Sequence, residues 1–180
     1  DGCLMEGISQ EVISLAGRLK LKKLIVIWDD NGITIDGPLD LSCNTDQISR
    51  FQSSGWSTFS CDAHDPIEID QAINEAKKDS RPSLIAAKSI IGFGAKTKQG
   101  TSGAHGSPLG KDEVENLRNN LNWKHEEFVV PSNIKDAWEK IGSRNNQKFN
   151  DWSKRFHSLS KKKKTYFLNE LNQIFPPSLK

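Results

Sequence analysis

The stretch "KLIVIWDDNGITIDG", residues 23–37, decides the fold of this chain. Its first half is a short apolar run, which is typical of a strand buried on both faces of a parallel sheet. Its second half crowds carboxylates, an amide and glycines into the turn directly after that run. In open α/β sheets, ligands bind beyond the carboxyl ends of the strands. The stretch therefore predicts a parallel sheet with a binding loop at Asp29–Gly37.

Strand and helix signals alternate on either side of this stretch. Two further apolar runs are typical of strands, and three segments carry apolar residues at helical spacing or a helix-capping signature. The expected strands are Trp56–Cys61 and residues 82–90, and the expected helices are Met5–Arg18, a segment capped by Asp65, and Lys111–Leu121. This alternation predicts the α/β class, with a mostly parallel sheet flanked by helices.

The character of the sequence changes after Trp123. Apolar residues such as Phe149, Trp152 and Phe156 recur at helical spacing on a strongly charged background, which predicts helices that lie over a surface. Four consecutive lysines at 161–164 are typical of a solvated helix face. We therefore divide the chain into an α/β unit, residues 1–124, and a helical segment, residues 125–180.

Composition excludes several classes of partner. The 180 residues carry a net charge of only +2, which argues against nucleic acid. No apolar run approaches the length of about 18 residues that a membrane span requires. The three cysteines are far apart and odd in number, which favours a reduced, cytoplasmic setting. The first residue is Asp rather than Met, and we expect a piece of a longer polypeptide.

The loop after the first strand does not match a self-contained calcium site. An EF-hand loop requires oxygen ligands at its positions 1, 3 and 5 and glycine at position 6. Counted from Asp29, positions 5 and 6 are Ile33 and Thr34. The amide oxygen of Asn31 and a backbone carbonyl of the turn remain as ligands for a hard cation such as Mg²⁺. Because Mg²⁺ requires octahedral coordination, another carboxylate must come from elsewhere.

The first residues, "DGCLMEG", offer that carboxylate. Gly2 lacks a Cβ, so the backbone beside Asp1 can approach a bulky anion. The helix that begins nearby favours negative charge at its N-terminus. Together with Asn31 after the apolar strand, these residues predict a site for a diphosphate and a magnesium ion.

This combination resembles the thiamine diphosphate fingerprint, in which Gly-Asp-Gly is followed by Asn at the spacing between Asp1 and Asn31. The motifs "DGCLMEGIS", "DDNGITIDG", "IIGFG" and "HGSPLG" stand in the order and at the spacings familiar from transketolases. "LNWKHEEFVVP" resembles the start of their interdomain linker. The sequence is thus identified as a member of the transketolase family along essentially its whole length. The resemblance implies that residues 1–124 are part of the diphosphate-binding domain and that residues 125–180 are the helical interdomain linker.

The resemblance also implies roles for single residues. Asp1, Asn31 and the backbone carbonyl of Ile33 would bind the metal, which we expect to be Mg²⁺, with Ca²⁺ or Mn²⁺ as substitutes. Gly2 would donate its N–H to the diphosphate of the cofactor, and Asn31 would lie against that group. His105 would be the catalytic residue that contacts both the cofactor and the sugar.

Other implied features concern the assembly of the enzyme. Glu6 and Glu11 match acidic positions near the dimer contact, where carboxylates of the family link the two cofactor sites. Gln10 departs from the family pattern, because many relatives have histidine there. Residues 100–104, "GTSGA", lack a histidine that many relatives carry, which could alter contacts with the substrate.

The implied activity is the transfer of a two-carbon ketol unit from a ketose phosphate to an aldose phosphate, in the pentose phosphate pathway of carbohydrate metabolism. The cofactor would act as the electron sink. In transketolases the activating glutamate belongs to a pyrimidine-binding domain of the partner subunit, so this chain alone is expected to be inactive. A split-chain transketolase subunit, a dihydroxyacetone synthase-like enzyme and a non-catalytic remnant that serves as an interaction module remain as alternatives.

Overall fold

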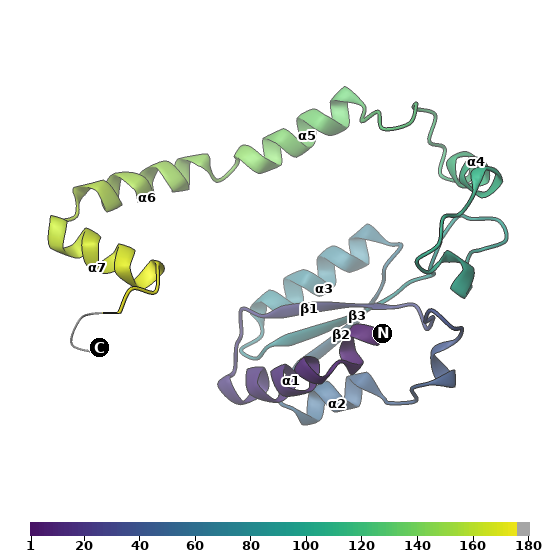
Figure 1. Cartoon of the computed structure of the whole chain (residues 1–180), viewed down its shortest axis with the longest axis horizontal. Helices are drawn as coiled ribbons and strands as arrows, with labels where there is room; N and C mark the ends of the chain where they lie inside the picture. The colour runs from purple at the N-terminus through teal and green to yellow at the C-terminus, as the bar shows by residue number, and fades with distance from the viewer. Residues whose placement is uncertain (176–180) are drawn as a thin grey trace. The chain divides into compact units, whose positions relative to one another are not determined.

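The computed structural model describes residues 1–175 of the chain. It divides into two compact units, Asp1–Lys124 and His125–Lys180. Among the described residues, no helix combines the length and the apolar character that crossing a bilayer demands. The helices and strands of both units are labelled in Figure 1.

A three-stranded parallel sheet forms the centre of the first unit. Its strands are β1 (Ile25–Asp30), β2 (Ser57–Asp62) and β3 (Ser83–Lys88). The strand order is β1-β3-β2, so β3 is central, and Ser83 aligns with both Ile25 and Ser57. Because all three strands run in the same direction, their carboxyl ends meet at one edge of the sheet. The expected class, α/β with a parallel sheet flanked by helices, is confirmed.

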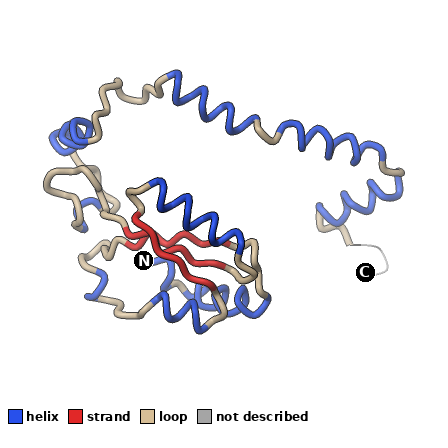
Figure 2. The backbone as a smooth tube through the Cα atoms, turned by 180° about the vertical axis from the view of Figure 1, so that it is seen from behind, coloured by secondary structure: helices blue, strands red, loops and turns tan. Residues whose placement is uncertain are grey.

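Helices cover both faces of the sheet, with α1 and α2 on one face and α3 on the other (Figure 2). The helices of this unit are α1 (Gly7–Leu19), α2 (Gln47–Ser53), α3 (Pro66–Lys78) and α4 (Lys111–Asn120). Single 3₁₀ turns are η1 (Gly2–Met5), η2 (Leu39–Leu41) and η3 (Ser102–Ala104). Each predicted strand and helix of the unit is present within one or two residues of its expected bounds, whereas α2 was not predicted.

The core consists of two layers because side chains of a strand alternate between its faces. On the α1 face, Leu84 packs with Ile13, Phe51 and Trp56. The rings of Phe51 and Trp56 meet edge to face with centroids 4.9 Å apart, and the indole N–H of Trp56 donates to the carbonyl of Ile13 at 2.8 Å. On the α3 face the buried residues are Cys61, Ala72, Ala76, Ile85 and Ala87. The small side chains there let α3 lie close to the sheet.

The predicted cap of α3 by Asp65 is confirmed. The carboxylate of Asp65 accepts hydrogen bonds from the N–H groups of Ile67 at 2.8 Å and Glu68 at 3.4 Å. The carboxylate of Glu68 accepts a hydrogen bond from the N–H of Asp62 at 2.8 Å. Glu68 therefore ties the first turn of α3 to the end of β2.

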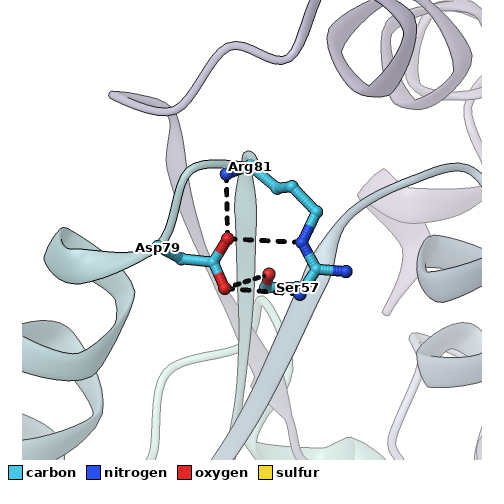
Figure 3. A network of polar contacts seen from close by, with 3 residues as sticks. All are labelled: Ser57, Asp79 and Arg81. Carbon is cyan, nitrogen blue, oxygen red and sulfur yellow. Dashed lines mark hydrogen bonds and ion pairs between the residues drawn. The ribbon is translucent and has the colours of Figure 1, made fainter.

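A polar network closes the amino edge of the sheet, at the connection from α3 to β3 (Figure 3). One carboxylate oxygen of Asp79 accepts from the backbone N–H of Arg81 at 2.8 Å and from its Nε at 3.3 Å. The other oxygen accepts from the hydroxyl of Ser57 at 2.5 Å and from Nη2 of Arg81 at 3.3 Å. The Arg81 side chain, followed by the Ser57 hydroxyl, holds the pKa of Asp79 far below its usual value.

This network predicts a pH-dependent contribution to stability. Because the folded pKa of Asp79 is depressed, its contribution is complete above the unfolded value of about 4 and is lost as the pH falls below it. We expect Asp79→Asn to lower the free energy of unfolding by about 1–3 kcal/mol at pH 7. The difference from wild type should shrink at pH 3. Urea unfolding at both pH values measures the free energy of unfolding of each protein. Asp40→Asn, at an exposed position, is the control. Equal stability of Asp79→Asn and wild type at pH 7 would contradict the role of Asp79.

Residues 125–175 of the second unit contain three helices. They are α5 (Ser132–Ser143), α6 (Asn146–Ser158) and α7 (Lys161–Leu171). Aromatic rings join α6 to α7, since Phe156 stacks on Trp152 and also meets Phe167, each pair with centroids 5.4 Å apart. The lysines at 161–164 form the first turn of α7, which Ser160 caps. Helices occur where the spacing predicted them, and the assignment of this unit as an interdomain linker stays a prediction.

Candidate metal and diphosphate site

The carboxylate of Asp1 lies against the end of β1 and the loop that follows it. One oxygen accepts the backbone N–H of Gly32 at 3.1 Å, and the other accepts the indole N–H of Trp28 at 2.9 Å. Asp1 is thereby held beside Gly32, the residue that directly follows Asn31, although 31 positions separate Asp1 from Gly32 in sequence. The two segments from which the sequence predicts metal ligands meet at the carboxyl edge of the sheet.

The loop after β1 is shaped by its own hydrogen bonds. The side-chain oxygen of Asn31 accepts the N–H of Ile33 at 2.9 Å, and its amide donates to Asp29 at 3.2 Å. Gly32 has a φ of +68°, which favours glycine at this turn. An isolated bridge between Ile33 and Pro38 closes the loop through the carbonyls of Gly32 and Gly37. The bridge therefore leaves the carbonyl of Ile33 unused.

These groups fit a hard divalent cation by their chemistry. A carboxylate, an amide oxygen and a backbone carbonyl are the oxygen donors that Mg²⁺ accepts, with phosphate and water completing the shell. Each oxygen of Asp1 accepts one hydrogen bond, and a carboxylate oxygen has capacity for more than one partner. Residues 1–175 contain no group of three or more His, Cys, Asp or Glu side chains placed to bind a metal. A metal at this edge therefore depends on the amide and carbonyl donors beside Asp1.

The other two carboxylates at the end of β1 have partners of their own. Asp30 is buried, and its carboxylate pairs with the Lys88 ammonium at 2.5 Å. Asp29 accepts hydrogen bonds from the hydroxyl of Ser89 and from the amide of Asn31. These contacts join the tips of β1 and β3, and they place the start of the loop after β3 beside the candidate site.

The turn η1, which contains Gly2, is held from the first residues of α1. The hydroxyl of Ser9 donates to the carbonyl of Cys3 at 2.6 Å, and the amide of Gln10 donates to that of Leu4 at 2.8 Å. The side chain of Arg50 in turn donates to Gln10. Gln10, which departs from the family pattern, thus supports the turn through its amide. The space beside Gly2 is open, because a Cβ built there would meet no atom within 4 Å.

His105 follows the turn η3 in the loop between β3 and α4, and its side chain is exposed. Its backbone N–H donates to the carbonyl of Ser102 at 2.9 Å. No hydrogen bond within residues 1–175 joins its imidazole to Asp1 or Asn31. The loop starts at the correct edge of the sheet, since the N–H of Ser89 donates to the carbonyl of Asp30 at 3.2 Å. The catalytic role of His105 stays a prediction.

Glu113 anchors the loop between β3 and α4. This role of Glu113 was not predicted from the sequence. Its carboxylate is buried and accepts the N–H groups of Lys96 at 2.7 Å and Thr97 at 3.1 Å, together with the Thr97 hydroxyl. The Thr97 hydroxyl, with these backbone N–H groups, lowers the pKa of Glu113. Nearby, the side-chain amide of Asn120 donates to the carbonyl of Gly94 at 2.7 Å. Two side chains of α4 therefore hold the first half of the loop that carries His105.

Glu6 and Glu11 are both exposed. Glu6 is the N-cap of α1, and its carbonyl accepts the N–H of Ser9 at 3.0 Å. The same helix exposes large apolar side chains, with 70% of Ile8 and 58% of Leu15 accessible. The place of Glu6 and Glu11 in a dimer contact stays a prediction. The exposed apolar residues beside them fit a surface that a partner subunit would cover.

The imidazole of His64 packs against and hydrogen-bonds to the loop that follows β3. Its Nε2 accepts the backbone N–H of Ile90 at 3.0 Å, and its ring stacks on Phe93 with centroids 4.0 Å apart. It lines an open pocket of about 510 Å³ together with Asp62 and Lys88. The contacts of the imidazole hold the start of the loop after β3.

Nearly the whole chain is similar to transketolases. Residues 1–176 match the family described as "Transketolase, thiamine diphosphate binding domain". The chain is 45% identical to a transketolase of Rhodobacter capsulatus over 179 residues, which are 99% of this chain and 27% of that relative. It is 50% identical to a transketolase of Cereibacter sphaeroides over 144 residues, which are 80% of this chain and 22% of the relative.

Solved structures agree with the sequence comparison. The transketolase of Campylobacter jejuni superposes with a TM-score of 0.86 at 33% identity, over 98% of this chain and 28% of that one. A Pichia stipitis transketolase in complex with sedoheptulose 7-phosphate gives a TM-score of 0.82 at 40% identity, over 88% of this chain and 24% of that one. This chain spans about a quarter of the length of these relatives. It belongs to the family of the transketolase thiamine diphosphate-binding domain.

Proposed function

We propose that this chain forms part of a transketolase that moves a two-carbon ketol unit from a ketose phosphate to an aldose phosphate, using thiamine diphosphate and a divalent metal. The observation that carries the proposal is the hydrogen bond from the Gly32 N–H to the Asp1 carboxylate, 3.1 Å long. It brings a carboxylate and a glycine-containing turn to the loop of Asn31, as a site for a metal-bound diphosphate requires. When bound, the cofactor would supply the electron sink for the carbanion.

The residues of this chain would bind and orient the cofactor. Asp1, Asn31 and the carbonyl of Ile33 would hold Mg²⁺, for which Ca²⁺ or Mn²⁺ could substitute. Gly2 would donate its backbone N–H to the diphosphate. The open space beside Gly2 supports this role, because it leaves the backbone there accessible to a bulky anion.

His105 would contact the cofactor and the sugar from the loop between β3 and α4. This role requires that the loop keeps one conformation, and the contacts of Glu113 with Lys96 and Thr97 support that requirement. An exposed imidazole can donate to or accept from sugar hydroxyls. We therefore assign substrate contact and proton transfer to His105 among the residues of this chain.

The rest of each active site would come from segments outside this chain. Relatives that match it are about four times longer, and the Pichia stipitis relative binds sedoheptulose 7-phosphate. We infer sugar-phosphate substrates of the pentose phosphate pathway and a pyrimidine-binding domain on the same or a partner chain. We also infer a cytoplasmic homodimer with Glu6 and Glu11 near its contact, and no turnover by the 180 residues alone. Residues 1–124 would be part of the diphosphate-binding domain and 125–180 the interdomain linker.

Calorimetric titration of the complete protein that contains this chain tests the proposal. We expect thiamine diphosphate to bind in the presence of magnesium and to bind much more weakly after the metal is chelated. Transfer from xylulose 5-phosphate to ribose 5-phosphate should require both components. Absence of binding, or equal affinity for thiamine diphosphate with and without magnesium, would overturn the proposal and favour a remnant without catalytic function.

A further inference from the structure

We infer that Trp28 is a positioning residue, whose indole N–H orients the Asp1 carboxylate toward a metal ion. The Nε1–H group donates to one carboxylate oxygen at 2.9 Å while the Gly32 N–H donates to the other at 3.1 Å. The inference rests on the proposed function for the identity of the metal site. The contact itself is a property of the folded chain.

The place of Trp28 in β1 explains why its indole can serve this purpose. Leu24, Val26 and Trp28 are alternate residues, and all three pack against the core layer of the α1 face. Leu4 of the turn η1 packs against the same layer. The apolar part of the indole therefore lies against a rigid surface, and its one polar atom is aimed at the residue just before that turn. Tryptophan suits this position because its ring is apolar and carries one donor.

Two donors from different segments restrict the carboxylate more than one would. With a single hydrogen bond, the Asp1 side chain could still rotate about its Cβ–Cγ bond. With one donor on each oxygen, the plane of the carboxylate is set relative to β1 and to the loop of Asn31. Neither donor is charged, so the negative charge stays available to a cation. Groups that orient metal ligands from behind typically contribute a factor of about 10–100 to metal affinity.

Trp28→Phe isolates the hydrogen bond from the packing, because phenylalanine keeps an aromatic ring and removes the donor. In the complete protein with thiamine diphosphate present, we expect Mn²⁺ to bind about 10- to 100-fold more weakly in this variant. Electron paramagnetic resonance of free Mn²⁺ measures this affinity without any turnover. Trp28→Tyr, which restores a donor on a shorter ring, should recover part of the loss. Trp138→Phe, at a position 69% exposed on α5, is the matched control.

The outcomes separate this inference from the proposed function. If the wild-type protein binds no Mn²⁺ with the cofactor, the proposed function fails. If wild type binds and Trp28→Phe binds equally well, the inference is wrong and the function stands. An independent readout is the indole ¹H–¹⁵N resonance of Trp28, which should shift in Asp1→Asn without metal or cofactor. If the resonance does not shift in Asp1→Asn, the inference is wrong even if Trp28→Phe binds Mn²⁺ more weakly. A change in packing would then explain the weaker binding.

Discussion

Gly17→Ala should destabilise the unit of residues 1–124 by about 3 kcal/mol, at the upper end of the usual cost of overpacking a core. A Cβ built on Gly17 would lie 1.7 Å from the carbonyl oxygen of Ser54 and 2.9 Å from its carbonyl carbon. Both atoms are backbone, so no rotamer change relieves the overlap. Gly17 is buried in α1, and Ser54 directly follows α2, with its own N–H donating to the carbonyl of Arg50. The substitution must therefore push two helices apart over the core.

Gly7→Ala provides the comparison that isolates this effect. Gly7 begins the same helix, and a Cβ there would meet no atom within 4 Å. Because alanine has a higher helix propensity than glycine by up to about 1 kcal/mol, Gly7→Ala should leave stability unchanged or raise it. Urea unfolding followed by circular dichroism measures both variants. A Gly17→Ala protein with the wild-type midpoint would show that α1 and α2 can separate at no cost.

Asp1→Asn should weaken the magnesium-dependent binding of thiamine diphosphate by at least about 100-fold, since outer-shell partners alone contribute up to that factor. Asparagine has nearly the same shape, yet it removes the negative charge and turns one acceptor into a donor. That donor would face the N–H of either Trp28 or Gly32, so one of these hydrogen bonds would become a repulsive contact. Titration calorimetry of the complete protein at saturating Mg²⁺ gives the affinity.

Asp36→Asn is the matched control for charge, because Asp36 is an exposed carboxylate in the same loop region. It should change the affinity for the cofactor by less than twofold. Circular dichroism of the Asp1 variant should match that of wild type, which excludes unfolding as the cause of its weaker binding. If Asp1→Asn binds thiamine diphosphate with magnesium as wild type does, Asp1 is no ligand of the metal.

Most of the fold could be predicted because its signals are local. The apolar run before Asp29 has the length and composition of a buried parallel strand, and Asp65 with Pro66 starts a helix by its own chemistry. The helix α2 escaped because it has only 7 residues, and so short a segment shows little periodicity. The first helix begins at Gly7 rather than Met5 because Glu6 is extended and the residues before it form a separate 3₁₀ turn.

The site was predictable in part for a different reason. Asn31 directly follows β1, so its place at the carboxyl edge follows from the topology of a parallel sheet. Asp1 follows no described strand, and only the resemblance to transketolases implied its place beside Asn31. The residues that support the site, Trp28 and Glu113, could not be predicted from the topology of the sheet. In the sequence Trp28 is one more apolar residue of a strand, and its hydrogen bond depends on where the fold places Asp1. Glu113 reads as an ordinary acidic residue of a first helical turn, and its contact with Thr97 depends on the path of a long loop. Both contacts are tertiary.

The position of β1 at the margin of the sheet links assembly to ligand affinity. Its backbone pairs with β3 along one side, and no described strand pairs with the opposite side. Such a margin is a template for a further strand. Asn31 continues β1 without a break, so a strand added there would immobilise the base of the loop. Ordering the loop is then part of the free-energy cost both of pairing that strand and of binding an ion. By thermodynamic linkage, each of these events raises the affinity for the other.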